Sequence, residues 1–93
     1  MTSVYISGPM EGVQNYEENF RRAECKLIID GYAVVNPAVV GCKGLSREEL
    51  LTLDIELLKK CDAIYMLDGW QQSRGANREY GFALGDGMKI MLE

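Results

Sequence analysis

The chain has 93 residues, of which 47% are hydrophobic and 26% are charged, and its formal net charge at pH 7 is −4. This is the composition of an ordinary globular protein, so we expect residues 1–93 to form a single domain. The acidic balance argues against binding a nucleic-acid backbone, and without a run of about 18 apolar residues the chain predicts neither a transmembrane helix nor a signal peptide. Histidine is absent, which excludes Ser-His-Asp and Cys-His catalysis and removes the commonest transition-metal ligand.

Strand and helix signals alternate along the chain, which predicts an α/β fold with a parallel sheet. An apolar run over residues 4–7 predicts the first strand, which residues 8–9 (Gly-Pro) end. Asn15 followed by Glu18 predicts a capping box that opens a helix, and Gly31 ends it. The face of this helix expected to be buried carries Tyr16, Phe20, Ala23, Leu27 and Ile28.

The middle of the chain repeats this order. Residues 32–35 predict a second strand, which residues 36–37 (Asn-Pro) end. A loop over residues 38–45 is long enough to be more than a connector. Ser46 and Glu49 then predict a second capping box, which opens a second helix.

The last third of the chain predicts one more helix between two strands. Residues 63–67 form the third strand, and a polar loop follows it. The third helix spans residues 76–86, and Gly87 ends it. Residues 89–92 supply a fourth strand.

These elements predict a flavodoxin-like three-layer α/β/α domain whose short parallel sheet has the strand order 2-1-3-4. In such a fold the carboxyl ends of the strands and the N-termini of the helices meet at one edge of the sheet. The loops at that edge supply the candidate substrate-binding residues, which are Gly8, Pro9, Met10, Gly12, Asn36, Trp70, Ser73 and Gly75.

Two features of the sequence bear on its context. Cys25, Cys42 and Cys61 are odd in number and widely spaced, which is typical of reduced thiols in a cytoplasmic protein, with a redox or metal-binding role as the alternative. Leu92 and Glu93 resemble residues left by a cloning vector before a purification tag, and we expect them to carry no information.

Two carboxylates lie where helical periodicity expects apolar side chains. Asp54 falls within the apolar stripe of the second helix, and Glu79 falls within that of the third. Their apolar neighbours are Leu50, Leu57, Leu58 and Cys61 around Asp54, and Ala76, Phe82 and Ala83 around Glu79. Because burying an unpartnered carboxylate is costly, a functional role is favoured, and paired carboxylates are the minimum for cleaving a glycosidic bond. The structural alternatives are an ion pair from Glu79 to Arg74 or Arg78, and a hydrogen bond from a loop backbone to Asp54.

Other residues at the same edge each have a functional and a structural interpretation. Residues 8–12 follow a strand and precede a helix, which suits them to hold an anion or a sugar, or to form a plain tight turn. Ser73 at a helix N-terminus is suited to bind an anion or to cap the helix. Trp70 is suited to stack on a base or to pack on its own loop. Tyr5 belongs either to the core or to a pair with a catalytic carboxylate.

Nearly the whole chain resembles the nucleoside 2-deoxyribosyltransferase-like family, and in particular a small bacterial and phage-associated branch of it. The resemblance rests on residues 5–12 (YISGPMEG), on residues 54–62, and on Ser73-Arg74-Gly75 followed by residues 79–83 (EYGFA). The family includes enzymes that hydrolyse 2'-deoxynucleoside 5'-monophosphates to the base and deoxyribose phosphate.

The resemblance implies a role for each of four residues. Glu79 is expected to be the nucleophile that attacks the anomeric carbon, and Asp54 to assist at the sugar or the base. Tyr5 is expected to hydrogen-bond near the nucleophile, and Ser73 to contact a 5'-phosphate.

We therefore expect an N-glycosidase or deoxyribosyltransferase that acts on a nucleoside or nucleotide and needs no metal or organic cofactor. The alternatives are a non-catalytic nucleotide-binding module and an NAD-cleaving hydrolase that uses the same glutamate. The first alternative is favoured by Pro9, which stands where the monophosphate hydrolases have a phosphate-binding serine, and by Glu11, whose charge repels a phosphate. The small sheet leaves edges to cover, and relatives are dimers or larger, so we also expect a homodimer or higher oligomer.

Overall fold

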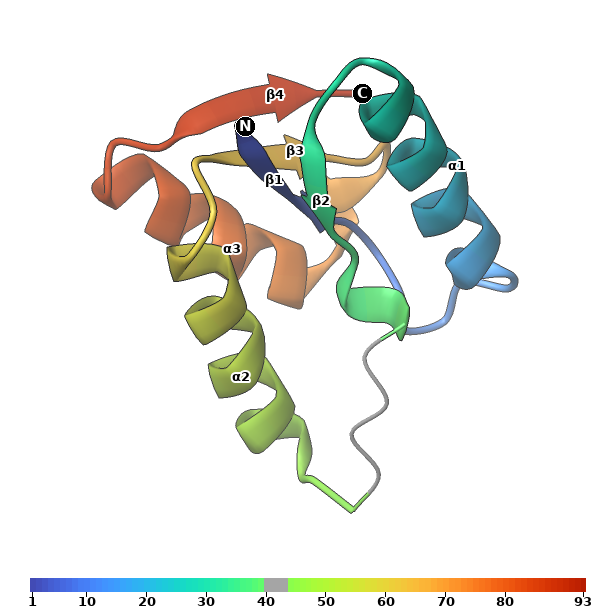
Figure 1. Ribbon diagram of the computed structural model, residues 1–93. Helices are drawn as coiled ribbons and strands as arrows, with labels where there is room; N and C mark the ends of the chain where they lie inside the picture. The colour runs from blue at the N-terminus through green and yellow to red at the C-terminus, as the bar shows by residue number, and fades with distance from the viewer. Residues whose placement is uncertain (40–43) are drawn as a thin grey trace.

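The computed structural model describes residues 1–39 and 44–93, so Cys42 and part of the predicted loop lie outside the described residues. Four strands form one parallel sheet in the order β2-β1-β3-β4, which confirms the predicted topology (Figure 1). The strands are β1 (Ser3–Ser7), β2 (Ala33–Val35), β3 (Ala63–Met66) and β4 (Lys89–Leu92). The helices are α1 (Tyr16–Ile29), α2 (Arg47–Lys59) and α3 (Arg74–Gly85), with 3-10 turns η1 (Pro37–Val39) and η2 (Trp70–Gln72).

The sheet separates α1 from α2 and α3, so the three-layer flavodoxin-like arrangement is also confirmed (Figure 1). Successive side chains of a strand point to opposite faces. Along β1, Val4 and Ile6 therefore pack against Phe20 of α1. Tyr5 points to the other face and packs against Leu58 of α2. This alternation decides which residues of β1 can reach the site described below.

The predicted capping box at the start of α1 is wrong. Asn15 precedes the helix in a left-handed conformation with φ of 60°, and its side chain makes no capping hydrogen bond. Its backbone carbonyl accepts a hydrogen bond from the N–H of Glu18, whose side chain pairs with Arg21 on the surface. A side chain caps a helix from an extended conformation, which Asn15 does not adopt.

Two apolar residues predicted to face the core are exposed. Phe20, Ala23 and Leu27 form the buried stripe of α1, and Ile28 is turned by about 100° from Leu27 and is 54% exposed. Leu50 in the first turn of α2 is also exposed and lies at a cavity. Neither residue contributes to the buried core.

The starts of the other two helices follow the sequence more closely. Ser46 and Glu49 form the predicted capping box of α2, in which each side chain bonds to the other's backbone N–H. Helix α3 begins at Arg74, two residues earlier than predicted, because the Ser73 side chain caps it by accepting from the N–H of Ala76.

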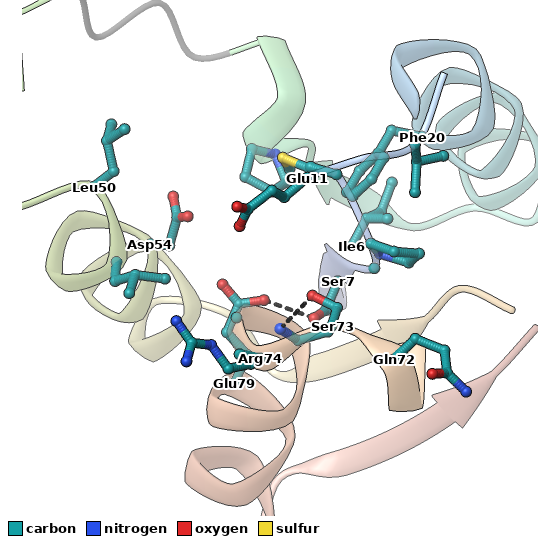
Figure 2. Close-up of a pocket in the computed structure, with 18 of the residues that line it drawn as sticks. Ile6, Ser7, Glu11, Phe20, Leu50, Asp54, Gln72, Ser73, Arg74 and Glu79 are labelled. Carbon is teal, nitrogen blue, oxygen red and sulfur yellow. Dashed lines mark hydrogen bonds between the residues drawn. The ribbon is translucent and has the colours of Figure 1, made fainter. Parts of the chain in front are cut away.

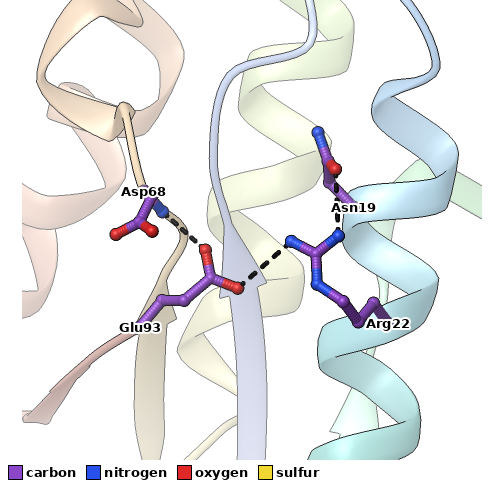
Figure 3. A network of polar contacts seen from close by, with 4 residues as sticks. All are labelled: Asn19, Arg22, Asp68 and Glu93. Carbon is purple, nitrogen blue, oxygen red and sulfur yellow. Dashed lines mark hydrogen bonds and ion pairs between the residues drawn. The ribbon is translucent and has the colours of Figure 1, made fainter.

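Leu92 and Glu93 are integrated into the fold, so the expectation that they carry no information is wrong. Leu92 pairs with Met66 in the sheet. The Glu93 carboxylate accepts from the backbone N–H of Asp68 at 2.8 Å and forms an ion pair with Arg22 of α1 at 3.5 Å (Figure 3). These contacts join the end of the chain to the loop after β3 and to α1.

Within residues 1–39 and 44–93, every helix falls short of the length and apolarity needed to cross a bilayer. Cys25 is exposed and Cys61 is buried, and both are free thiols.

Candidate active site

A cavity of about 410 Å³ opens at the carboxyl edge of the sheet, between the loop after β1 and the helices α2 and α3. The predicted site residues that line it are Gly8, Pro9, Met10, Asp54, Ser73, Gly75 and Glu79. Figure 2 shows the carboxylates of Asp54 and Glu79 directed toward this space from two different helices. The fold therefore brings together the two carboxylates that helical periodicity singled out.

Glu79 lies in the second turn of α3 and is 6% exposed. The hydroxyl of Tyr5 donates to its Oε2 at 2.8 Å, and the hydroxyl of Ser7 donates to its Oε1 at 2.6 Å (Figure 2 shows the Ser7 contact). Tyr5 and Ser7 are two residues apart in β1, so both point to the face of the sheet that α3 covers. One strand therefore fixes both oxygens of the carboxylate.

Burial raises the pKa of Glu79 from an ordinary 4.5 to about 7, because a charged carboxylate loses hydration there. The donated hydrogen bonds from Ser7 and Tyr5 and the charge of Arg78 oppose this rise, and the charge of Asp54 adds to it. Among the described residues Glu79 forms no ion pair, so the alternative of a salt bridge to Arg74 or Arg78 is wrong.

Asp54 lies two turns into α2 and is partly buried. Its carboxylate receives no hydrogen bond from any side chain or backbone group of residues 1–39 and 44–93. Burial raises its pKa from an ordinary 3.8 to about 6. Asp54 and Glu79 therefore both titrate close to neutral pH, and the charge of Asp54 makes that of Glu79 harder to form.

Tyr5 is fully buried and lies behind Glu79, not in the wall of the cavity. Burial first, and then the charges of Glu79 and Asp54, raise the pKa of Tyr5 above its ordinary value. Its hydroxyl therefore remains protonated at neutral pH and donates to Glu79 without interruption.

Two residues of the cavity wall, Gly8 and Ser73, also have structural roles. A Cβ on Gly8 would lie 2.7 Å from the side chain of Leu67, so only glycine allows the turn after β1 to pack against the end of β3. Ser73 caps α3, which confirms the structural interpretation, and it also lines the cavity. Because its oxygen accepts from the N–H of Ala76, its own hydrogen is left to donate to a ligand.

Three predicted binding residues lie outside the cavity wall. Trp70 stacks on Tyr80, with ring centroids 4.5 Å apart and an angle of 29° between the rings, which supports the packing interpretation, and its stacking on a base stays a prediction. Asn36 is buried and accepts from the N–H of Ala38, while its amide donates to Glu24. Gly12 forms a turn with φ of +75°. Each therefore has a structural role, and its contact with a ligand stays a prediction.

Several residues of the cavity escaped prediction as binding residues. Ser7, Glu11, Arg47, Gln72 and Arg74 all line it. For Ser7 the sequence holds a signal, because it shares the face of β1 with Tyr5. For Arg47 it holds none, since its partner Glu11 is 36 residues away along the chain. Within the described residues, no group of three Asp, Glu or Cys side chains is placed to share a metal ion.

Comparison with known proteins supports the fold. The family model described as Domain of unknown function (DUF4406) matches residues 2–92. No curated protein matches the chain. Among solved structures, the 2-deoxyribosyltransferase of the psychrotolerant bacterium Bacillus psychrosaccharolyticus superposes with a TM-score of 0.75 and 21% sequence identity, over 98% of this chain and 71% of that chain. That protein is described as a biocatalyst for the synthesis of antiviral and antitumoral nucleosides. The present chain thus has a deoxyribosyltransferase-like fold, as the sequence predicted.

Proposed function

The chain belongs to the family described as Domain of unknown function (DUF4406), and we propose that it cleaves the N-glycosidic bond of a nucleoside or nucleotide with Glu79 as the nucleophile. The observation that carries this proposal is the Glu79 carboxylate, which lines the cavity and is fixed from behind by Tyr5 and Ser7. Asp54 faces the same cavity from a second helix. Two carboxylates on either side of a bound sugar are the usual means of glycoside cleavage.

In the first step an oxygen of ionised Glu79 attacks C1' of the sugar while the bond from C1' to the base nitrogen breaks. The electron pair of that bond moves to the base, which takes a proton from Asp54 and leaves. The positive charge that develops on the sugar in the transition state is stabilised by the buried carboxylate beside it. The product of this step is a sugar held on Glu79 through an ester bond.

In the second step water attacks C1', and Asp54 takes up its proton. The ester bond breaks, Glu79 becomes a carboxylate again, and the sugar is released with its original configuration. A second base in place of water turns the hydrolase into a transferase. The two outcomes differ only in which acceptor reaches the cavity.

The first step needs Glu79 without a proton and Asp54 with one. Because the pKa of Glu79, about 7, lies above that of Asp54, about 6, a single proton shared near neutral pH resides more often on Glu79, and the reactive state is the minor one. Tyr5 and Ser7 favour the ionised form of Glu79, since both donate to it.

A non-catalytic nucleotide-binding module is the second candidate. Pro9 lines the cavity at the turn after β1, where the monophosphate hydrolases have a serine, and this departure from the enzymes favours a protein that does not carry out their reaction. In that case the cavity holds the ligand and the carboxylates do not react.

One experiment separates the candidates. Deoxynucleosides, their 5'-monophosphates and NAD are incubated with the wild type, with Glu79→Gln and with Glu56→Gln, an exposed surface control on α2, and released base is measured by chromatography. Free base from the wild type and from Glu56→Gln, but not from Glu79→Gln, supports the glycosidase. Binding without release of base from any compound would favour the binding module, and nicotinamide release alone would favour the NAD-cleaving hydrolase.

We also propose that the chain self-associates. Large apolar side chains are exposed, among them Ile29 at 84% and Val39 at 71%, and exposed apolar groups favour contact with another surface. Light scattering at high protein concentration should give at least the mass of a dimer, and a monomer there would contradict this expectation.

A further inference from the structure

Three charged residues that the mechanism above does not use lie at the mouth of the cavity. Arg47 is the first residue of α2, Arg74 is the first residue of α3, and Glu11 lies in the turn between β1 and α1. All three line the same cavity as Asp54 and Glu79. Segments far apart in the sequence therefore place two guanidinium groups and one carboxylate around one opening.

The Glu11 carboxylate forms an ion pair with Arg47 and accepts a hydrogen bond from it. Arg47 lowers the pKa of Glu11 through this hydrogen bond and through its charge, and the charge of Arg74 lowers it further. The mouth of the cavity therefore already binds one oxyanion, which is a carboxylate of the chain itself.

This ion pair is easily exchanged. The side chains of Arg47 and Glu11 are 51% and 76% exposed, and exposed ion pairs contribute little because water competes for both partners. Arginine forms stronger, bidentate hydrogen bonds with a phosphate, which carries more charge and more acceptor oxygens than a carboxylate. A phosphate that enters the cavity can therefore displace Glu11 into solvent.

We infer that Arg47 and Arg74 form a phosphate subsite which Glu11 occupies in the free protein and from which a phosphate group of the substrate displaces it. This inference rests on the proposed function and makes the preferred substrate a nucleoside 5'-phosphate. The N–H groups at the start of α3 and the hydroxyl of Ser73 border the same opening and add donors to the subsite.

The subsite gives Glu11 a role in specificity. The sequence predicts that the charge of Glu11 repels an incoming phosphate, and in the structure that charge is paired with Arg47. The Glu11 carboxylate competes with ligands for Arg47, so a ligand must carry an anionic group that binds the arginines more tightly than a carboxylate does. Weakly bound anions are excluded, and phosphate esters are admitted.

Calorimetric titration with inorganic phosphate tests this subsite without any need for turnover. Glu11→Gln should bind phosphate about three- to tenfold more tightly than the wild type, because the competitor is lost. Arg47→Gln and Arg74→Gln should bind it about tenfold more weakly. Glu56→Gln and Arg21→Gln change the net charge by the same amounts at exposed positions away from the cavity, and each should stay within about twofold of the wild type.

Two results would overturn the inference. One is Glu11→Gln binding phosphate no more tightly than Glu56→Gln does. The other is phosphate binding that Arg47→Gln and Arg74→Gln leave unchanged or that no protein shows at all. Thermal unfolding of each variant establishes that it is folded, and Arg47→Gln leaves the Ser46–Glu49 capping box intact.

The same series separates this inference from the proposed function. In the Glu79→Gln background, a deoxynucleoside and its 5'-monophosphate are compared with and without Glu11→Gln, and only the monophosphate should gain affinity. If phosphate binding follows this pattern but the wild type releases no base, the phosphate subsite is supported and the proposed enzymatic activity is contradicted. If the wild type releases base at a rate that substitutions of Arg47 and Glu11 leave unchanged, the activity is supported and the subsite is contradicted.

Discussion

Glu79 and Asp54 face one cavity, but the fold holds the two carboxylates in different ways. Glu79 is 6% exposed and receives a hydrogen bond on each oxygen. Asp54 is only partly buried, and no group in residues 1–39 and 44–93 donates to it. The difference suits two roles, because a nucleophile must be held in one orientation, whereas a proton carrier must exchange with the leaving base and with water.

The source of this difference is the sheet. The donors to Glu79 come from alternate positions of β1, the strand between β2 and β3, and one of them, Tyr5, belongs to the buried core. Asp54 lies on α2, and its side chain points toward the cavity (Figure 2). The contrast gives predictions for each carboxylate separately.

The largest expected effect is the loss of activity in Glu79→Gln. The amide keeps the shape of the side chain but cannot form the ester bond, so kcat/KM should fall at least about 10³-fold in a base-release assay. Glu56→Gln serves as the control and should retain full activity. A loss of less than about tenfold would show that Glu79 is not the nucleophile.

Asp54→Asn should lower activity by about 10²- to 10³-fold, because the leaving base then lacks its proton donor. This loss should depend on the base. A deoxynucleoside of 7-methylguanine carries a base that leaves without protonation, so its cleavage should be affected much less. Equal losses on both substrates would assign Asp54 to binding the sugar and not to proton transfer.

The stability of the protein should depend on the protonation of Glu79. Its pKa in the folded protein, about 7, is higher than the ordinary 4.5. Its stabilising contribution is therefore complete below about pH 4.5 and is lost as the pH rises through about 7, and the free energy of unfolding falls by about 3 kcal/mol in total. Protonation of Asp54 also stabilises the folded protein at low pH, but it contributes less to the free energy of unfolding because Asp54 is more exposed.

Denaturant unfolding at about pH 4.5 and pH 8 measures this effect. Glu79→Gln should lose most of the pH-dependent fall that the wild type and Glu56→Gln show, and it should be the more stable protein at pH 8. A fall of the same size in Glu79→Gln would mean that burial of Glu79 is not its cause.

The smallest effect concerns the donors to Glu79. Removal of one hydrogen bond in Ser7→Ala should raise the pKa of Glu79 further and shift the acid limb of the kcat/KM profile upward by about one pH unit. Tyr5→Phe should act in the same direction. Ser3→Ala, at the other end of β1, is the matched control and should leave the profile in place. A uniform loss of activity without a shift of the acid limb would point to a purely structural role for Ser7.

Much of the fold followed from local patterns in the sequence. Alternating strand and helix signals predicted the order of the sheet, and the pair Ser46 and Glu49 predicted the start of α2. The wrong prediction for the start of α1 also came from a local pattern. The pair Asn15 and Glu18 has the spacing of a capping box, but Asn15 adopts a left-handed conformation that residue types alone do not specify.

In the candidate site, too, local sequence patterns predicted some residues and not others. Helical periodicity located Asp54 and Glu79, because a carboxylate in an apolar stripe is conspicuous. It could not locate Arg47, whose contact with Glu11 depends on how a loop and a helix approach one another in space. The sequence left two interpretations of Trp70 open, base stacking and packing on its own loop, and the structure adds that Tyr80 of α3 stacks on its ring.

The most direct test of the account is to trap the sugar on Glu79. A nucleoside with fluorine at C2' of an arabino sugar destabilises the positive charge of both transition states, so the ester intermediate should accumulate when the base is a good leaving group. Mass spectrometry after incubation should show one added fluorinated sugar, located on the peptide that contains Glu79, with one equivalent of base released. Release of base without any covalent adduct, or an adduct on Asp54 instead, would contradict the central claim that Glu79 is the nucleophile.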